Sequence, residues 1–350
     1  MLPASNGEGH AMAAATGTNL QVLLRRRPQG APTPEDFEVV ETPVPEPAEG
    51  QVLVRARFLS LDPYMRGRMS EAKSYAKPVE LGAVMEGQTA GEVAASRHPD
   101  FKPGDTVLGG YGWQRFSCVG PERLFKVEAG DAAVPLSTSL GVLGMPGLTA
   151  WVGLEDIGQP KAGETVVVSA ASGAVGQVVG QIAKIRGCRV VGIAGGRAKC
   201  DFVTGELGFD ACLDHRAGEL KAGLDAACPE GIDVYWENVG GEVQAAVFPR
   251  LRDFARMVMC GMIAEYNDTS PRPGPNLMAC VRKRLRIQGF IVSDSGWQRY
   301  GRFRQEMVGW MREGRLKWRE DVVDGLRNAP TGFIGLLKGE NFGKLVVRVD

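Results

Sequence analysis

The feature that most limits the possible folds is a regular alternation of strand-like and helix-like segments after residue 163. The strand-like runs are nearly continuous in Val, Ile, Ala and other apolar residues, and glycines close several of the helices between them. Strands that are apolar on both faces are typical of a parallel sheet covered by helices on both sides. Six runs, the count of the doubly wound dinucleotide-binding fold, lie at 164–170, 189–194, 210–214, 232–239, 255–261 and 286–292.

The turn between the first of these strands and its helix carries a glycine pattern. It reads AASGAVG over 170–176 and matches G-x-G-x-x-G with Ala171, Gly173 and Gly176. Gly173 would let backbone N–H groups approach a pyrophosphate at the positive helix N-terminus, and Gly176 would let the helix pack close to the sheet. Because alanine replaces the first glycine, we expect this turn to be built with negative φ. The pattern between a strand and a helix predicts a dinucleotide site; the alternative is a glycine-rich turn without a ligand.

The end of the second strand indicates which dinucleotide is bound. An acidic residue at this place holds the ribose 2′-hydroxyl of NAD. In CRVVGIAGGRAK (188–199) there is none, and the first acid is Asp201. Arg197 and Lys199 stand there instead, and cations suit a 2′-phosphate. Positive charge at a helix N-terminus is mildly unfavourable without an anion nearby. The sequence therefore predicts NADP(H), although ordinary surface cations are the alternative.

The segments outside the alternating region are organised differently. Residues 19–143 contain short, glycine-broken runs with strand-like alternation, typical of a small irregular barrel. The segment 297–326 is charged and reads as helical, and 341–349 reads as a final strand that returns to the first domain.

These patterns predict two domains, in agreement with the chain length. The β-rich domain is expected to be discontinuous, with residues 19–143 and 297–350, and the dinucleotide-binding domain is expected at 144–296. The small and polar residues 1–18 are expected to form a disordered tail.

Charge, hydropathy and cysteine content argue against several protein classes. The 41 Lys and Arg residues balance 41 Asp and Glu residues, which argues against a nucleic-acid partner. No apolar run approaches the ~18 residues of a membrane helix, and the N-terminus has no secretory or mitochondrial signal pattern. Seven cysteines without a C-x-x-C pair predict neither a disulfide framework nor a zinc cluster. We therefore expect a cytoplasmic protein without a membrane partner.

Seven segments carry more specific patterns. They are LSLDPYMRGRM (59–69), GMPGLTAW (144–151), AASGAVGQVVGQIAKIRGCRVVGIAG (170–195), ENVGGE (237–242), CGMIAEYN (260–267), GFIVSD (289–294) and LKGENFGKLVV (337–347). Together they resemble the zinc-independent medium-chain reductases, which include the leukotriene B4 dehydrogenase/prostaglandin reductase group, plant alkenal double-bond reductases and bacterial curcumin reductase. The resemblance runs from about residue 20 to 350. It implies a Rossmann domain beside a GroES-like domain, and a homodimer.

The resemblance also implies an activity, the NADPH-dependent reduction of the C=C bond of α,β-unsaturated ketones and aldehydes. Hydride would go to the β-carbon, while a tyrosine and the nicotinamide ribose hydroxyl stabilise the resulting enolate oxygen. The tyrosine of the family's Y-N motif falls on Tyr266. A tyrosine suits this role because it donates a hydrogen bond to developing charge and can then pass on its proton. Alternatively, Tyr266 is only a turn residue.

The family's cofactor contacts fall on three groups of residues. Phosphate contacts fall on Lys199, with Arg197 beside it and His215 where many members have a tyrosine. The turn contacts fall on Gly173, Ala174, Val175, Gly176 and Gln177. The nicotinamide end is expected near Cys260, Gly261, Met262, Phe290 and Val292, with Met145 and Thr149 beneath it. Two asparagines of family motifs, Asn238 and Asn341, are further expected cofactor contacts.

On the substrate side, Tyr64 is expected to form a wall of the pocket, or only to pack. Arg66 is expected to pair with Asp62 or to contact substrate. Zinc-dependent relatives carry a cysteine ligand near Asp62 and a Gly-His-Glu at 86–88, which reads EGQ here. The sequence therefore predicts no metal site. A quinone oxidoreductase of the same superfamily and a non-catalytic NADPH-binding sensor are the alternative functions.

Overall fold

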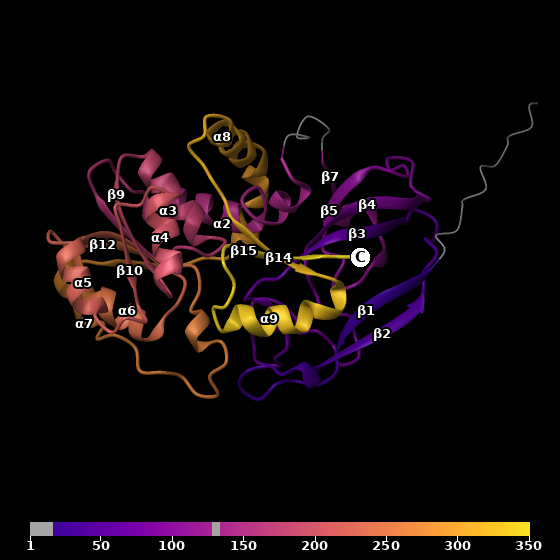
Figure 1. Ribbon diagram of the computed structural model, residues 1–350, viewed down its shortest axis with the longest axis horizontal. Helices are drawn as coiled ribbons and strands as arrows, with labels where there is room; N and C mark the ends of the chain where they lie inside the picture. The colour runs from indigo at the N-terminus through magenta and orange to yellow at the C-terminus, as the bar shows by residue number, and fades with distance from the viewer. Residues whose placement is uncertain (1–16, 128–133) are drawn as a thin grey trace, which may run out of the picture.

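A computed structural model describes residues 17–127 and 134–350, which form two lobes side by side (Figure 1). Of the tail expected at 1–18, residues 1–16 lie outside the described residues. Thr18 already belongs to the first strand, β1 (Thr18–Leu24). No helix in the described ranges is long and apolar enough to cross a membrane.

One lobe is built on a parallel sheet. Within the described residues, its six strands stand in the order β10-β9-β8-β11-β12-β13. Their bounds are β8 Thr165–Ser169, β9 Arg189–Ala194, β10 Ala211–Asp214, β11 Ile232–Glu237, β12 Leu251–Met259 and β13 Arg286–Gly289. The strand order reverses between β8 and β11, and ligands of such sheets bind at the carboxyl ends of the strands near that point. The predicted fold class is confirmed.

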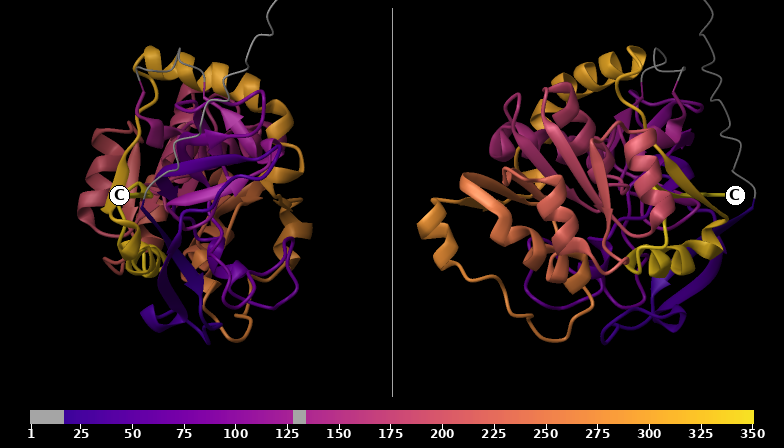
Figure 2. Two further views of the ribbon diagram at one scale, coloured as in Figure 1. Left: turned by 90° about the vertical axis from the view of Figure 1, so that its right-hand side faces the viewer. Right: turned by 60° about the vertical axis from the view of Figure 1, so that its left-hand side comes forward.

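Helices cover both faces of this sheet (Figure 2). They are α2 Met145–Gly153, α3 Gly176–Ile185, α4 Arg197–Gly205, α5 Leu220–Ala227, α6 Gly241–Val247, α7 Met278–Lys283 and α8 Tyr300–Arg312. Alternate residues of β8 enter two different cores: Val166 and Val168 pack with α2 and α3, and Val167 packs with α5 and α6. This two-sided burial explains the nearly continuous apolar run of the strand.

The other lobe is β-rich. The hairpin of β1 and β2 (Phe37–Pro43) lies beside a mixed sheet in the order β14-β15-β3-β4-β5-β7, in which β6 also pairs with β3. The remaining bounds are β3 Val52–Ser60, β4 Thr89–Ser96, β5 Thr106–Gly109, β6 Phe116–Val119, β7 Leu124–Lys126, β14 Glu320–Asp324 and β15 Lys344–Arg348. The short α1 (Met65–Arg68) follows β3, and α9 (Ala329–Leu337) packs on the same core.

The C-terminal segment returns to this first lobe. Strand β15 pairs antiparallel with β3, with Val346 opposite Ser60. The prediction that 297–326 is helical is wrong at its end, because 320–324 forms β14, which pairs in parallel with β15. The strand has only two apolar residues between acidic ones and lies at the sheet edge, where charged residues are common. Its pairing with β15 therefore determines its conformation more than its own sequence does.

Candidate active site

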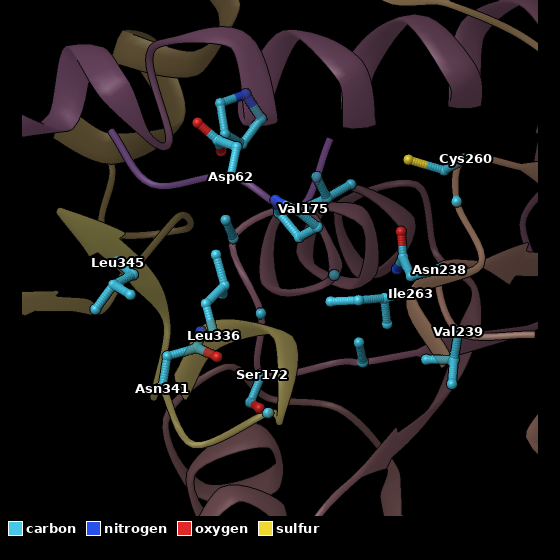
Figure 3. A pocket seen from close by; sticks show the side chains of 18 of the residues that line it. Asp62, Ser172, Val175, Asn238, Val239, Cys260, Ile263, Leu336, Asn341 and Leu345 are labelled. Carbon is cyan, nitrogen blue, oxygen red and sulfur yellow. The ribbon is translucent and has the colours of Figure 1, made fainter. Parts of the chain in front are cut away.

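A cavity of about 430 Å³ lies between the two lobes, at the carboxyl ends of the parallel strands. Both lobes line it. Figure 3 shows Asp62, Leu336, Asn341 and Leu345 on one side and Asn238, Val239, Cys260 and Ile263 on the other. All residues predicted at the site line this cavity except Gln177, Arg197 and Met262.

The glycine turn after β8 forms one wall. Gly173, Ala174, Val175 and Gly176 line the cavity, and α3 begins at Gly176. A Cβ on Gly176 would lie 2.2 Å from the carbonyl oxygen of Ala170, so only glycine fits there. The expectation of negative φ is wrong for the turn as a whole, because Ala170 has φ 50°. A left-handed alanine costs about 1 kcal/mol or more, and the packing of the turn must offset that strain.

Gln177 faces away from this wall and holds the lobes together. Its side-chain oxygen accepts a hydrogen bond from the Arg319 N–H at 2.9 Å, and its amide donates to the Arg319 carbonyl at 3.3 Å. The next turn of the helix repeats the contact, since Gln181 accepts from the Lys317 N–H at 2.8 Å. Gln177 therefore fixes the backbone of the segment just before β14 to α3.

A basic cluster stands at the ends of β9 and β10. It consists of Lys199, His215 and Arg216, which all line the cavity. A Cβ on Gly195 would lie 2.9 Å from His215 Nε2 and 3.0 Å from Arg216 Nε, so both side chains lie across that glycine. Burial and the neighbouring Arg216 lower the pKa of Lys199, and the same causes lower the pKa of His215.

Two carboxylates, Asp321 for Lys199 and Asp214 for His215, act on this cluster electrostatically. Lys199 Nζ donates to the Gly339 carbonyl at 2.8 Å, but none of the three basic side chains has an ion pair within the described residues. Asp214 points its carboxylate at backbone instead, and accepts from the N–H groups of Gly196 at 2.8 Å and Arg216 at 2.9 Å. Three basic groups without an ion pair around a cavity are the arrangement expected of an anion site.

The structure separates Arg197 from this cluster and adds Arg216. The Arg197 side chain is 91% exposed and lies 3.6 Å from Asp201, one helical turn along α4. Sequence reasoning missed Arg216, although it follows His215 directly at the end of β10. The DHR sequence at a predicted strand end was the available signal.

The turn after β11 is held by a buried carboxylate. Glu237 accepts hydrogen bonds from Ser169 Oγ and from the N–H groups of Val239 and Gly240 at 2.7–3.0 Å. Asn238 Nδ2 donates to the Ser169 carbonyl at 2.7 Å, and its Oδ1 accepts from Trp236 Nε1 at 3.0 Å. Asn238 therefore lines the cavity while it ties β11 to β8.

Tyr266 follows β12 and a single 3₁₀ turn, Ile263–Glu265. Its hydroxyl lies against Gly261, where a Cβ would be only 2.8 Å from the phenol oxygen. Burial raises the pKa of Tyr266 to about 12, and the nearby Cys260 adds to this. The phenol is therefore protonated at neutral pH and available as a donor beside the cavity. Met262 packs on Gly240 instead of lining the cavity.

The wall on the side of the β-rich lobe contains a buried ion pair. Lys344 is 2% exposed, and its Nζ lies 3.0 Å from Asp62 Oδ1 and 2.7 Å from the Leu61 carbonyl oxygen. The predicted pairing of Arg66 with Asp62 is wrong, because Lys344 takes that place. Arg66 instead donates to Asn267 Oδ1 at 3.1 Å and to the Gly30 carbonyl at 2.8 Å.

The remaining predicted residues line the space between these walls. Tyr64 belongs to the same side as Asp62, and Arg68 lies over its ring at 5.3 Å. Thr149 donates to the Met145 carbonyl at 2.7 Å, and Asn341 donates to the Gly343 carbonyl at 2.8 Å. Phe290 and Val292 complete the lining. Within 17–127 and 134–350, no group of three or more His, Cys, Asp or Glu residues could hold a metal ion.

Comparison with known proteins places these features in a family. Residues 20–127 match the family model described as the N-terminal domain of oxidoreductase, and residues 174–312 match that of zinc-binding dehydrogenase. The NADPH-dependent curcumin reductase of Escherichia coli (strain K12) is 54% identical over 95% of this chain and 97% of its own length. The NADP(+)-dependent 2-alkenal reductase of Nicotiana tabacum is 41% identical over 95% of this chain and 98% of its own.

A solved structure is similar to this chain over nearly its whole length. CurA from Vibrio vulnificus in complex with NADPH superposes with a TM-score of 0.90 and 49% identity, over 95% of this chain and 99% of that one.

Proposed function

Because this chain belongs to the zinc-independent group of the medium-chain dehydrogenase/reductase family, we propose that it reduces the C=C bond of α,β-unsaturated ketones and aldehydes. It is an NADPH-dependent oxidoreductase, as are its relatives. The observation that carries the proposal is the half-buried Tyr266 phenol, which lines the cavity beside Gly261. The curcumin and alkenal reductases among the relatives support the same substrate class.

The residues present fit NADP(H). A Cβ on Gly173 or Gly176 would crowd the Ala170 carbonyl oxygen, at 3.1 and 2.2 Å, and the turn opens a helix whose positive end faces the cavity. We propose that this turn holds the pyrophosphate. We propose that Lys199, His215 and Arg216 hold the 2′-phosphate, because they form a basic cluster on the cavity wall, at the strand end where NAD-binding proteins carry an acid. Arg197 is assigned no direct contact, since its side chain points to solvent.

The nicotinamide end belongs at the opposite end of the cavity, near Tyr266. We propose that the following residues surround it: Met145, Thr149, Asn238, Cys260, Gly261, Phe290, Val292 and Asn341. Most of them present apolar or backbone surface, which excludes water and strengthens hydrogen bonds made there. Met262 acts indirectly by packing beneath the Gly240 turn.

When bound, the reduced nicotinamide supplies a hydride to the β-carbon of the substrate. Tyr266 then donates a hydrogen bond to the carbonyl oxygen as that oxygen gains negative charge. Because the pKa of Tyr266 is about 12, the phenol does not protonate the weakly basic carbonyl oxygen of the substrate. The enolate oxygen that forms after hydride transfer is a much stronger base and can accept this proton. Tyr266 can then give its proton to the enolate oxygen, which forms an enol. The enol becomes the saturated carbonyl compound when the α-carbon takes a proton from solvent and the oxygen returns its own proton to the phenolate, so the net reaction uses one hydride and one proton. Tyr64 bounds the substrate on the side of the β-rich lobe.

A substrate comparison tests this proposal. Purified protein is given NADPH with a linear alkenal, an enone or a benzoquinone, and NADPH oxidation and products are measured. Saturated aldehyde and ketone products support the proposal. Preferential turnover of the quinone would make the chain a quinone reductase, and NADPH binding without turnover of any substrate would favour the sensor. The homodimer implied by the resemblance and the cytoplasmic location expected from the composition stay predictions, the first of which light scattering can test.

A further inference from the structure

Two tyrosines line the cavity from opposite lobes. Tyr64 stands directly before α1 in the β-rich lobe, and Tyr266 follows the 3₁₀ turn Ile263–Glu265 in the other lobe. Under the proposed function, Tyr64 bounds the substrate while Tyr266 donates a hydrogen bond to its carbonyl oxygen. A displacement of about 1 Å between reacting groups can lower a rate about 100-fold. The turn that carries Tyr266 must therefore keep a fixed position relative to the β-rich lobe.

On the side of its own lobe, this turn is held by backbone hydrogen bonds. The N–H groups of Ile263 and Ala264 donate to the carbonyl groups of 238–239 at 3.1 and 3.0 Å. Both bonds lie before Tyr266 in the sequence. Residues 268–277, which come after it, form neither a helix nor a strand. The segment around Tyr266 therefore depends on further contacts for its position.

Arg66 of α1 supplies such a contact from the β-rich lobe. Its Nε donates to Oδ1 of Asn267, the residue directly after Tyr266, at 3.1 Å. Its Nη2 donates to the Gly30 carbonyl at 2.8 Å and to the Pro28 carbonyl at 3.4 Å. The planar guanidinium therefore joins three segments in one geometry, which are α1, the loop between β1 and β2, and the residue next to the phenol.

Burial makes this contact firm. Arg66 is only 7% exposed, and burial lowers the pKa of its guanidinium, which stays charged at neutral pH. Asp36 acts on it electrostatically but is itself paired with Arg26 at 2.6 Å. In the described chain, the partners of Arg66 within hydrogen-bond distance are neutral oxygen atoms. Losing one of them leaves a buried cation partly unsatisfied, so the guanidinium resists movement of Asn267 away from it.

We propose that Arg66 is a positioning residue of the reaction, which acts through Asn267 to keep the Tyr266 phenol within hydrogen-bond distance of the substrate carbonyl oxygen. The inference rests on the proposed function and extends it to two residues outside the cavity lining. Because the contact spans the two lobes, its loss displaces the phenol relative to Tyr64. The glycine turn and the basic cluster lie at the other end of the cavity, so the affinity for NADPH does not depend on it.

Removing the contact from the side of Asn267 tests this proposal. Asn267 is half-buried, and Asn267→Ala leaves the other two hydrogen bonds of Arg66 in place. In single-turnover reduction of an enone by protein saturated with NADPH, this variant should lower the rate about tenfold and change the Kd for NADPH less than about twofold. Asn267→Asp, whose carboxylate accepts the same hydrogen bond, should keep the rate within about twofold of the wild type.

Two further variants show whether the effect passes through the contact. Arg66→Met should lower the rate at least as much as Asn267→Ala, and combining the two should add little. If Arg66→Met does not fold, the Asn267 variants decide alone. Asn276→Ala is the matched control, because this exposed asparagine accepts a hydrogen bond from the Met278 N–H at 2.9 Å within its own lobe. Its rate should equal that of the wild type.

The same substitution in Tyr266→Phe separates positioning from a general loss of structure. Without the phenol there is no donor for the contact to place, so adding Asn267→Ala should change the remaining rate less than about twofold. An equal loss in both backgrounds, no loss in either, or a loss of NADPH affinity as large as the loss of rate overturns the inference, and the proposed function stands. If the wild type reduces no enone, both proposals fail.

Discussion

Replacing Lys199 tests the assignment of the 2′-phosphate site. Its ammonium group donates one hydrogen bond to the Gly339 carbonyl, which leaves two N–H groups for an anion in the cavity. A hydrogen bond between charged groups contributes about 1.5–3 kcal/mol. Since about 1.4 kcal/mol is a tenfold change in Kd, Lys199→Ala should raise the Kd for NADPH about 10- to 100-fold. The Kd for NADH, which lacks the phosphate, should change less than about threefold.

Arg197→Ala provides the matched control. This variant removes a positive charge two residues away on the same helix, but from a side chain that is 91% exposed and outside the cavity. Screening by solvent reduces the effect of such a charge, so both Kd values should change less than about threefold. Arg216→Ala should behave like Lys199→Ala, because Arg216 lines the cavity beside Gly195.

Titration of each variant with NADPH and NADH, followed by nicotinamide fluorescence or calorimetry, measures these constants directly. A thermal melt of each variant without cofactor checks that the fold is intact. Equal losses of affinity for NADPH and NADH in Lys199→Ala would refute the phosphate assignment. A loss in Arg197→Ala as large as in Lys199→Ala would show that general charge, and not contact, determines the preference.

Three further predictions concern the chemistry, the pH dependence and the stability of the site. Tyr266→Phe should lower kcat about 100-fold and change the Kd for NADPH little; an unchanged kcat in single-turnover measurements would remove the phenol from the reaction. Burial and nearby cations lower the pKa of His215, so it is neutral at pH 7 in the free protein, and a bound phosphate raises that pKa. NADPH binding at pH 6–6.5 should therefore be accompanied by proton uptake, which calorimetry in buffers of different ionisation enthalpy measures. His215→Phe should remove this uptake, and the same uptake in the variant would contradict the assignment. Lys344→Met leaves Asp62 buried without its partner and should lower the free energy of unfolding by about 3–5 kcal/mol, whereas a change below 1 kcal/mol in urea denaturation would show that the pair is not needed.

The parallel sheet could be predicted from the sequence because its signal is local. Each buried strand carries its own apolar run, because neighbouring residues are buried on opposite faces of the sheet. In β8, for example, Val166 packs into one core and Val167 into the other. Strand β14 has no such apolar run in its own sequence. It is a strand because it pairs with β15, where Val322 lies opposite Val346. Elements that depend on a distant partner are therefore the ones that sequence periodicity misses.

The same distinction applies to the site. Lys199 and Arg197 were both expected at the phosphate, but residues two apart on a helix point about 200° apart, so only one faces the cavity. The pairing of Lys344 with Asp62 joins residues 282 positions apart, and the position of Arg66 was misjudged for that reason. The left-handed Ala170 is a property of a packed turn, which composition and spacing do not encode.

The position of the transferred hydrogen tests the central claim most directly. The protein is given NADPH with deuterium at the transferring position of C4, together with an α,β-unsaturated ketone, and the product is analysed by NMR and mass spectrometry. The account predicts one deuterium on the former β-carbon, a solvent-derived proton on the α-carbon and an intact carbonyl group. Deuterium on the hydroxyl-bearing carbon of an allylic alcohol, or NADPH oxidation without deuterium in the organic product, would contradict it.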